Sequence, residues 1–467
     1  MKFLSPLASL LVLTALTHAE LTCAPVFQDH MILQQGMPVA VWGTADADSE
    51  VKLAFGKHEQ STKADDQGNW KLQLPALEAD QLEDFSKASA GKNLRISSGE
   101  ETLMIRDVLI GEVWLCSGQS NMAGKVKNNA MDPKDDLSKL QLPTIRQYRS
   151  DTGWISATEG DVREFSKVGL TFARRLQKEL KVPVGLLSAS VGGTQIHTWQ
   201  LPDASIDPAE KHAPGSNYLK HIMPLIGTSM KGALWYQGEG NARDGYAYFG
   251  KLKSLIKGWR SVWGQGEFPF LIVQLAGIGE SDPNKPDMGD GRAAIREAQL
   301  QAMKQITNVG LATAVDIGGP KEHPPNKTDI GKRLAAWALH HQYDRKITAS
   351  GPLITGFDIR CSTIAIQFKN AQGLTIADKG EGFGPPIVCP PGTDLPWLSI
   401  QGADGIWHSA TAWIEGDELL VVNTDVKKPK NVRYAFTNRP KGPYLYNKAG
   451  LPAFPFTTEK WEELTKE

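Results

Sequence analysis

The sequence predicts an α/β protein in which helices flank a parallel sheet, with additional small antiparallel β domains. Three observations support this. Apolar strands alternate with amphipathic helices over residues 106–345, and short alternating runs separated by turn residues occupy 20–105 and 346–438. Polar residues gather where strands of the middle region end. A chain of 467 residues is also too long for one ordinary core, so we expect several domains.

The first nineteen residues predict a signal peptide. Lys2 precedes an apolar stretch that runs to about Leu16, and Thr17-His18-Ala19 has the small residues of a cleavage site. The stretch is too short to span a bilayer, and no later segment is apolar enough to do so. We therefore expect an exported protein, secreted or periplasmic, without membrane insertion.

Charge and cysteine content exclude several function classes. A net charge of −1 gives no electrostatic reason to expect a nucleic-acid or anionic-membrane partner. The four cysteines fit no zinc template, and we expect neither a metal nor another cofactor. The spacing leaves a disulfide between Cys361 and Cys389 open, whereas Cys116 lies on an apolar run and is expected to be an inert buried thiol.

Two regions carry the short strands of antiparallel β structure. Residues 20–105 contain "MPVAVWGTA", "EVKLAF", "GNWKLQLP" and "KNLRISS", which predict a small β-sandwich. A second β domain is expected over 346–438, followed by an irregular tail over 439–467.

The region 106–345 is expected to form the parallel sheet and its helices. "DVLIGEVWLC" reads as a continuous buried strand, and "EFSKVGLTFARRLQKEL" carries apolar residues at helical spacing. Repeated strand–helix–strand units give a parallel sheet covered on both faces, whose chemistry lies beyond the carboxyl ends of the strands. The expected strands are 107–116, 182–190, 232–239, 268–276 and 310–317, and the expected helices are 164–180, 248–263, 293–306 and 327–342.

Polar residues follow four of these strands and supply the parts of an acyl-transfer site. Such a site needs a nucleophile, a base that takes its proton, and donors that stabilise an oxyanion. Serine is weakly nucleophilic until an imidazole accepts its proton, and glycine lets a substrate approach backbone N–H groups closely. The candidate parts are Ser120, His323, the amides of Gly192 and Gly193, and a side-chain amide from Gln237 or Asn241.

The surroundings of Ser120 differ from the nucleophile elbow of α/β-hydrolases. The sequence reads Gly118-Gln119-Ser120-Asn121-Met122, which lacks the second glycine of Gly-x-Ser-x-Gly. The blocks "GEVWLCSGQSNM", "VGGTQIHTW", "LWYQGEGNA" and "DIGGPKEHPPNKTDIGKRLA" instead resemble those of the sialate O-acetylesterases, within the SGNH/GDSL hydrolase superfamily. The likeness spans nearly the whole chain after residue 20.

The resemblance implies an SGNH-hydrolase-like fold and a role for each matched residue. Ser120 matches the nucleophile and His323 the general base, in a His-Pro pair that precedes a helix. The implied oxyanion hole consists of Ser120, Gly192 or Gly193, and Gln237 or Asn241.

The acid that orients the histidine departs from the family pattern. Related enzymes often carry an aspartate two or three residues before this histidine, where this chain has Lys321 and Pro320. Glu322 or Asp316 is a substitute, a backbone carbonyl could hold the imidazole, or the site is a Ser–His dyad.

Two classes of function follow from these residues. One is an exported serine esterase that removes O-acetyl groups from sugars, either sialic acids or polysaccharides such as xylan and pectin. The other is a non-catalytic carbohydrate-binding relative, silenced by loss of the orienting acid. Turnover of a simple aryl acetate distinguishes them. Trp199, Trp235 and Tyr236 could form a sugar-stacking wall, although aromatic core packing is the safer default.

The signal peptide yields the first prediction. Protein recovered from its natural source should begin at or near Glu20, because Thr17-His18-Ala19 is the expected cleavage site. N-terminal sequencing measures this, and recovery of chains that retain Met1 would contradict it.

Overall fold

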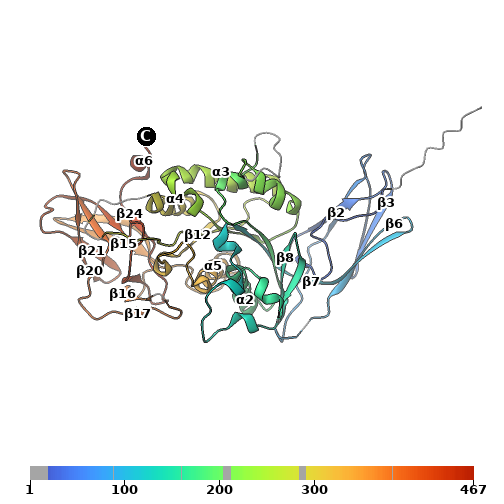
Figure 1. The fold of residues 1–467 in the computed structure, drawn as a ribbon, viewed down its shortest axis with the longest axis horizontal. Coiled ribbons are helices and arrows are strands. Elements are labelled where there is room, and N and C mark those ends of the chain that lie inside the picture. The colour runs from blue at the N-terminus through green and yellow to red at the C-terminus, as the bar shows by residue number, and fades with distance from the viewer. Residues whose placement is uncertain are drawn as a thin grey trace, which may run out of the picture.

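The structure is a computed structural model that describes residues 19–87, 89–158, 160–202, 212–282, 285, 291–380 and 382–466. Residues 1–18 of the predicted signal peptide lie outside these ranges. In the described part of the chain, no helix has the length and apolar character needed to cross a bilayer. Figure 1 shows the elements in three groups along the long axis, with N-terminal strands at one end, helices around a sheet in the middle, and C-terminal strands at the other end.

The N-terminal strands β2 to β6 pair antiparallel with one another, as predicted. Strand β2 pairs with β5, and β3 lies between β4 and β6. Buried and exposed residues alternate along β3 and β5, which is the pattern of strands with one face on a core. The strands are β1 (Ile32–Gln34), β2 (Val39–Thr44), β3 (Glu50–Phe55), β4 (His58–Lys63), β5 (Asn69–Leu74) and β6 (Lys92–Ser98).

One long strand, β7 (Glu101–Gly118), joins the N-terminal strands to the central sheet. Its first half pairs antiparallel with β6, and residues 109–111 pair in parallel with β1. From Glu112 onward it lies between β10 and β11. The boundary expected between residues 105 and 106 therefore falls inside a continuous strand.

The central sheet has the order β13-β12-β11-β7-β10-β8-β9 and is parallel except at its β9 edge. The chain winds from β7 to β8 and β10 on one side, then crosses to β11 on the other. Such a reversal of winding leaves a crevice at the carboxyl ends of the flanking strands. The remaining strands are β8 (Leu142–Arg149), β9 (Gly153–Ala157), β10 (Val184–Ser190), β11 (Gly232–Tyr236), β12 (Phe270–Gln274) and β13 (Val309–Thr313).

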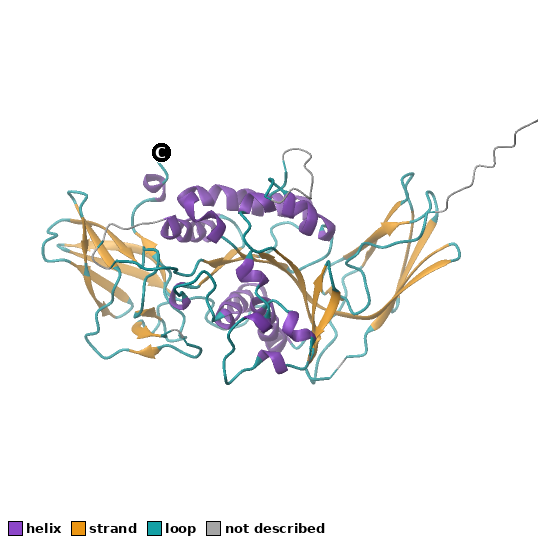
Figure 2. Cartoon of the chain, in the orientation of Figure 1, coloured by secondary structure: helices purple, strands orange, loops and turns teal. Residues whose placement is uncertain are grey.

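Helices cover both faces of this sheet (Figure 2). The pair α2 (Lys167–Leu180) and α5 (Lys327–Gln342) packs on one face, and the pair α3 (Tyr248–Trp263) and α4 (Gly291–Gln305) packs on the other. Helix α2 begins three residues later than predicted because Ser166 caps it, its Oγ accepting from the N–H of Gly169 at 3.1 Å. Two short helices are α1 (Ser120–Ala123) and α6 (Trp461–Leu464). The predicted α/β fold is confirmed.

The C-terminal strands form three small antiparallel sheets around a second core. The expected irregular tail contributes to two of them, because β23 pairs with β16 and β24 pairs with β22. Tail residues such as Leu445 and Phe456 are buried, so packing orders a segment with little local pattern. The strands are β14 (Leu353–Arg360), β15 (Thr363–Lys369), β16 (Thr375–Asp378), β17 (Ile387–Val388), β18 (Leu398–Gly402), β19 (Trp407–Ser409), β20 (Thr411–Glu415), β21 (Glu418–Val422), β22 (Pro429–Tyr434), β23 (Tyr444–Tyr446) and β24 (Phe456–Thr457).

The buried tail predicts a large effect of one substitution. Phe456 is 1% exposed, and its ring centroid lies 5.6 Å from that of Tyr434 and 5.9 Å from that of Phe368. Phe456→Ala should lower the free energy of unfolding by about 3–5 kcal/mol, as a cavity left by a buried ring does. Denaturant unfolding measures this. Ile387→Ala, on a side chain that is 77% exposed, is the control and should change stability by less than about 0.5 kcal/mol.

Candidate active site

The end of β7 has a backbone that only glycine adopts easily. Gly118 has φ +129°, and a Cβ there would lie 2.2 Å from the carbonyl oxygen of Tyr236 on β11. The next residue, Gln119, donates its N–H to that same oxygen at 3.0 Å, and its Oε1 accepts from the N–H of Gly240 at 3.2 Å. The turn after β7 is thereby fixed against β11, and Ser120 follows as the first residue of α1.

Ser120 and His323 lie in hydrogen-bond contact although 203 residues separate them. The distance between Oγ of Ser120 and Nε2 of His323 is 2.9 Å, which is within reach for proton transfer from a hydroxyl to an imidazole. Ser120 is partly buried, and His323 is exposed to solvent in the loop between β13 and α5. The structure therefore brings together the two residues that the sequence matched to nucleophile and base.

The two candidate orienting acids have other partners. Glu322 accepts from Nη2 of Arg292 at 3.0 Å. The carboxylate of Asp316 is fully buried, accepts two hydrogen bonds of 2.7 Å from Arg333, and accepts a third of 2.9 Å from the hydroxyl of Tyr446. Among the described residues, no carboxylate accepts from Nδ1 of His323. Asp316 instead anchors the start of the loop that carries His323.

Two glycines lie beside the serine with backbone N–H groups available. A Cβ on Gly192 would lie 3.5 Å from Cβ of Ser120, an ordinary van der Waals contact, so this glycine lies directly beside the serine. Gly193 has φ +72°, a left-handed conformation, and both glycines are exposed. Within the described part of the chain, the N–H groups of Ser120, Gly192 and Gly193 donate to no protein acceptor. These three donors are free for a negatively charged oxygen.

Only one of the two candidate side-chain amides has a hydrogen to spare. Gln237 donates one N–H to the carbonyl oxygen of Thr194 at 3.1 Å and the other to Oδ1 of Asn241 at 2.7 Å. Asn241 donates to Asp244 at 2.7 Å and keeps its second N–H. Gln237 is thus a buried structural residue, and Asn241 is the remaining candidate.

A polar cluster that the sequence did not reveal lies under the serine–histidine pair. Asn121 donates to Glu239 Oε1 and, at 3.0 Å, to the carbonyl oxygen of Glu322. The ammonium group of Lys327 donates to Oδ1 of Asn121 at 2.6 Å and to the carbonyl oxygen of Pro324 at 3.2 Å. Burial raises the pKa of Glu239 and lowers the pKa of Lys327 to about 8, against the attraction of Glu239.

The aromatic residues and cysteines singled out in the sequence lie away from any catalytic role in the structure. Trp199, Trp235 and Tyr236 are fully buried, and the first two rings meet edge to face at 6.0 Å, so they are core residues and no sugar-stacking wall. All four cysteines are free thiols, so Cys361 and Cys389 are unpaired. Burial raises the pKa of Cys116 to about 12, which makes its thiol unreactive.

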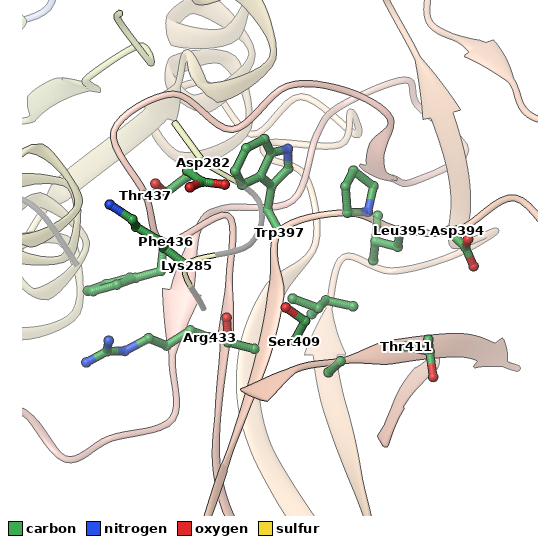
Figure 3. A pocket seen from close by; sticks show the side chains of 14 residues that line it. Asp282, Lys285, Asp394, Leu395, Trp397, Ser409, Thr411, Arg433, Phe436 and Thr437 are labelled. Atoms are coloured by element: carbon green, nitrogen blue, oxygen red, sulfur yellow. The ribbon is translucent and has the colours of Figure 1, made fainter. Parts of the chain in front are cut away.

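A pocket of about 230 Å³ lies apart from Ser120 and His323. Figure 3 shows Trp397, Arg433 and Phe436 from the C-terminal region around it, with Asp282 on the side of the central domain. Neither Ser120 nor His323 lines this pocket, so it belongs to a different part of the molecule.

Comparisons with known proteins agree with the fold and the blocks around these residues. Residues 110–340 match the family model described as carbohydrate esterase, sialic acid-specific acetylesterase. The sialate O-acetylesterase of Homo sapiens is 28% identical over 76% of each chain, and that of Rattus norvegicus is 27% identical over 93% of each chain. A crystal structure of a carbohydrate acetylesterase from Xanthomonas citri has a TM-score of 0.81 and 30% identity, covering 94% of this chain and 100% of that chain.

These matches define the class of the protein, which is a carbohydrate esterase. Within that class the chain belongs to the family of the sialate O-acetylesterases. The family predicted from the sequence blocks is confirmed.

The buried Asp316–Arg333 pair predicts a stability effect that is separate from catalysis. Asp316→Ala should cost about 3–5 kcal/mol of unfolding free energy, because it leaves the guanidinium of Arg333 buried without its carboxylate. Tyr446→Phe removes one hydrogen bond from the same carboxylate and should cost about 0.5–1.5 kcal/mol. Denaturant unfolding compares the two. Esterase activity per folded molecule should fall less in both variants than in His323→Ala, because Asp316 anchors only the start of the loop that carries His323. A folded Asp316→Ala variant as inactive as His323→Ala would contradict our placement of this residue.

Proposed function

We propose that this carbohydrate esterase is an exported enzyme that removes O-acetyl groups from sugars, with Ser120 as nucleophile and His323 as general base. The observation that carries the proposal is the 2.9 Å contact between Oγ of Ser120 and Nε2 of His323 at the carboxyl edge of the sheet. The predicted signal peptide over residues 1–19 supports export.

The first half of the reaction forms an acetyl-enzyme. Oγ of Ser120 attacks the acetyl carbonyl carbon while Nε2 of His323 takes the hydroxyl proton. The negative charge that develops on the carbonyl oxygen meets the N–H groups of Ser120 and Gly192 or Gly193, and the spare N–H of Asn241. The tetrahedral intermediate collapses, and the protonated His323 gives its proton to the departing sugar oxygen.

The second half releases acetate. A water molecule attacks the acetyl-enzyme, His323 takes a proton from it, and the same donors hold the second oxyanion. Ser120 then recovers its proton from His323. Exposure of Gly192, Gly193 and His323 leaves the reacting face open to solvent, which supports esters carried on bulky saccharides.

Sialic acids are the first substrate class to test, and acetylated xylan or pectin is the second. The first rests on the likeness to sialate O-acetylesterases, and the second on the likeness to a carbohydrate acetylesterase. Acetate release from a panel of these substrates separates the two.

The proposal predicts the effects of substitutions at the serine and the histidine. Ser120→Ala should fold normally and lose nearly all deacetylation, and His323→Ala should lower kcat by about 10²–10⁴-fold, the usual contribution of a general base. Turnover of an aryl acetate by pure protein is the measurement. An organophosphonate should label one serine, and peptide mapping should place the label on Ser120.

Matched controls use the neighbouring serine and a distant histidine. Ser117 is fully buried and its hydroxyl has no partner among the described residues, so Ser117→Ala should keep activity and fold. His340 bonds the carbonyl oxygen of Ile347 near the end of α5, and His340→Ala should also remain active. Full activity in Ser120→Ala would overturn the assignment, and sugar binding without any turnover by the intact chain would favour a non-catalytic relative.

A further inference from the structure

The ring of His323 needs a support that the carboxylates do not supply. A catalytic imidazole is usually oriented through Nδ1 by an acid, but Glu322 bonds Arg292 and Asp316 bonds Arg333. His323 is also exposed, so packing does little to fix its ring. Its position must come from the backbone on either side.

The carbonyl groups of the residues before and after His323 are both held by buried side chains. The carbonyl oxygen of Glu322 accepts from Asn121 at 3.0 Å, and the carbonyl oxygen of Pro324 accepts from Lys327 at 3.2 Å. Lys327 and Asn121 are joined to each other by a hydrogen bond of 2.6 Å. The side chains of Asn121 and Lys327, which are bonded to each other, therefore hold the backbone on both sides of the histidine.

Asn121 uses all of its amide groups in this arrangement. Its two N–H groups go to Glu239 and the Glu322 carbonyl, and its oxygen accepts from Lys327, so the amide has one orientation only. Asn121 follows Ser120 directly in the sequence. The residue that holds the histidine loop is thus the sequence neighbour of the proposed nucleophile. Few bonds therefore separate Ser120 from the contact that positions His323.

Lys327 is held in place by the start of helix α5. It is the first residue of α5, 1% exposed, and the helix N-terminus is capped by Asn326, whose side chain accepts from the N–H of Asp329 at 3.1 Å. A buried ammonium forms shorter and stronger hydrogen bonds to oxygen than a neutral donor does. Glu239, a partly buried residue that accepts from Asn121, supplies the neighbouring acidic group.

We propose that Asn121 and Lys327 act as positioning residues, a clamp on the two carbonyls beside His323 that holds its imidazole on Oγ of Ser120 without an orienting carboxylate. The proposal rests on the proposed roles of Ser120 and His323. It assigns to a buried amide and a buried lysine the work that the acid of a triad performs in related enzymes.

The clamp has a pH signature. Burial lowers the pKa of Lys327 to about 8, and the charge of Lys167 adds to this shift while that of Glu239 opposes it. The charge of Arg292 lowers the pKa of the same Glu239 carboxyl, against its burial. As pH rises through about 8, Lys327 loses its charge and the clamp weakens, so Ser120 should become less reactive. The free energy of unfolding should not fall over the same range. Lys327 holds its proton to a higher pH in the unfolded chain than in the folded one, so its contribution to folding stability increases as the pH rises.

The test measures the reactivity of Ser120 and does not depend on a natural substrate. The rate of organophosphonate labelling and the kcat for an aryl acetate are followed from pH 7 to pH 10 in the full chain. Wild type should label more slowly above about pH 8 while its melting temperature holds. Rates that stay level to pH 10 in wild type, together with a wild-type labelling rate in a folded variant that lacks the Lys327 ammonium, would overturn the proposal.

Two variants weaken the clamp in different ways. Lys327→Met combined with Glu239→Gln removes the ammonium without leaving an unpaired buried carboxylate, and Asn121→Ala frees the Glu322 carbonyl while keeping both charges. Each should lower the labelling rate and kcat by about 10- to 100-fold, the size expected for a displacement near 1 Å, with KM changed less than about twofold. The double variant should also lose the alkaline decline. Lys332→Met, on an exposed lysine of the same helix, is the matched control and should behave as wild type.

The outcomes separate the clamp from the serine mechanism itself. If a folded clamp variant labels Ser120 at the wild-type rate, the clamp is wrong and the serine–histidine roles stand. If the double variant does not fold, Asn121→Ala and the wild-type pH profile decide. Label on a residue other than Ser120 would instead overturn the proposed function, and the clamp with it.

Discussion

The position of every candidate catalytic group depends on how strand β7 ends. Its last residues pair with β10 on one side and β11 on the other, and Gly118 lies opposite Ser190 and Tyr236 in that register. The carbonyl oxygen of Tyr236 occupies the space of a Cβ on Gly118, so β7 and β11 approach more closely there than any other residue allows. Because β7 is buried from Val108 to Gly118, the turn that follows it is fixed by the core and not by solvent-exposed contacts. The loop after β10 consequently places Gly192 beside Ser120, and Asn241 in the loop after β11 is joined to the β10 loop by accepting from the N–H of Ile196.

The histidine reaches this edge on a loop that is anchored at both ends. Asp316 holds its start through Arg333 and Tyr446, and Lys327 holds its end at the first turn of α5. Both anchors are buried charged groups, which are costly unless fully paired and hydrogen-bonded. The tyrosine comes from strand β23, so the C-terminal strands help to support a loop of the central sheet. A segment that the sequence suggests is an irregular tail therefore contributes to the surroundings of the candidate site.

The sequence predicted those helices and strands whose own residues show a regular spacing of apolar side chains. Helices α3 and α5 have the predicted bounds because their apolar residues recur at helical spacing. The ends of the predicted strands fall within about four residues, except that β7 begins six residues before the predicted start. Strands β8 and β9 were missed, since β8 buries polar residues such as Arg146 and Gln147, whose partners lie far away in sequence. Motif blocks pointed to Ser120 and His323. They did not separate Gln237 from Asn241, because spacing does not show which N–H groups are already used. They also gave no sign of Lys327 beyond its place at the start of a predicted helix.

An exposed histidine that is held through its backbone differs from the histidine of a buried triad in what orients its ring and what stabilises its charge. A carboxylate on Nδ1 both orients the ring and stabilises the imidazolium that forms during the reaction. Carbonyl contacts beside His323 orient the loop but leave the new charge to solvent, which an exposed ring can reach. In the proposed mechanism, water at the ring provides the electrostatic support, and Asn121 and Lys327 provide the position. Such a site does not need to close around its substrate, and the proposed oxyanion donors on the exposed Gly192 and Gly193 are accessible in the same way. An acetyl group that projects from a large saccharide can then reach Ser120 while the rest of the sugar stays outside.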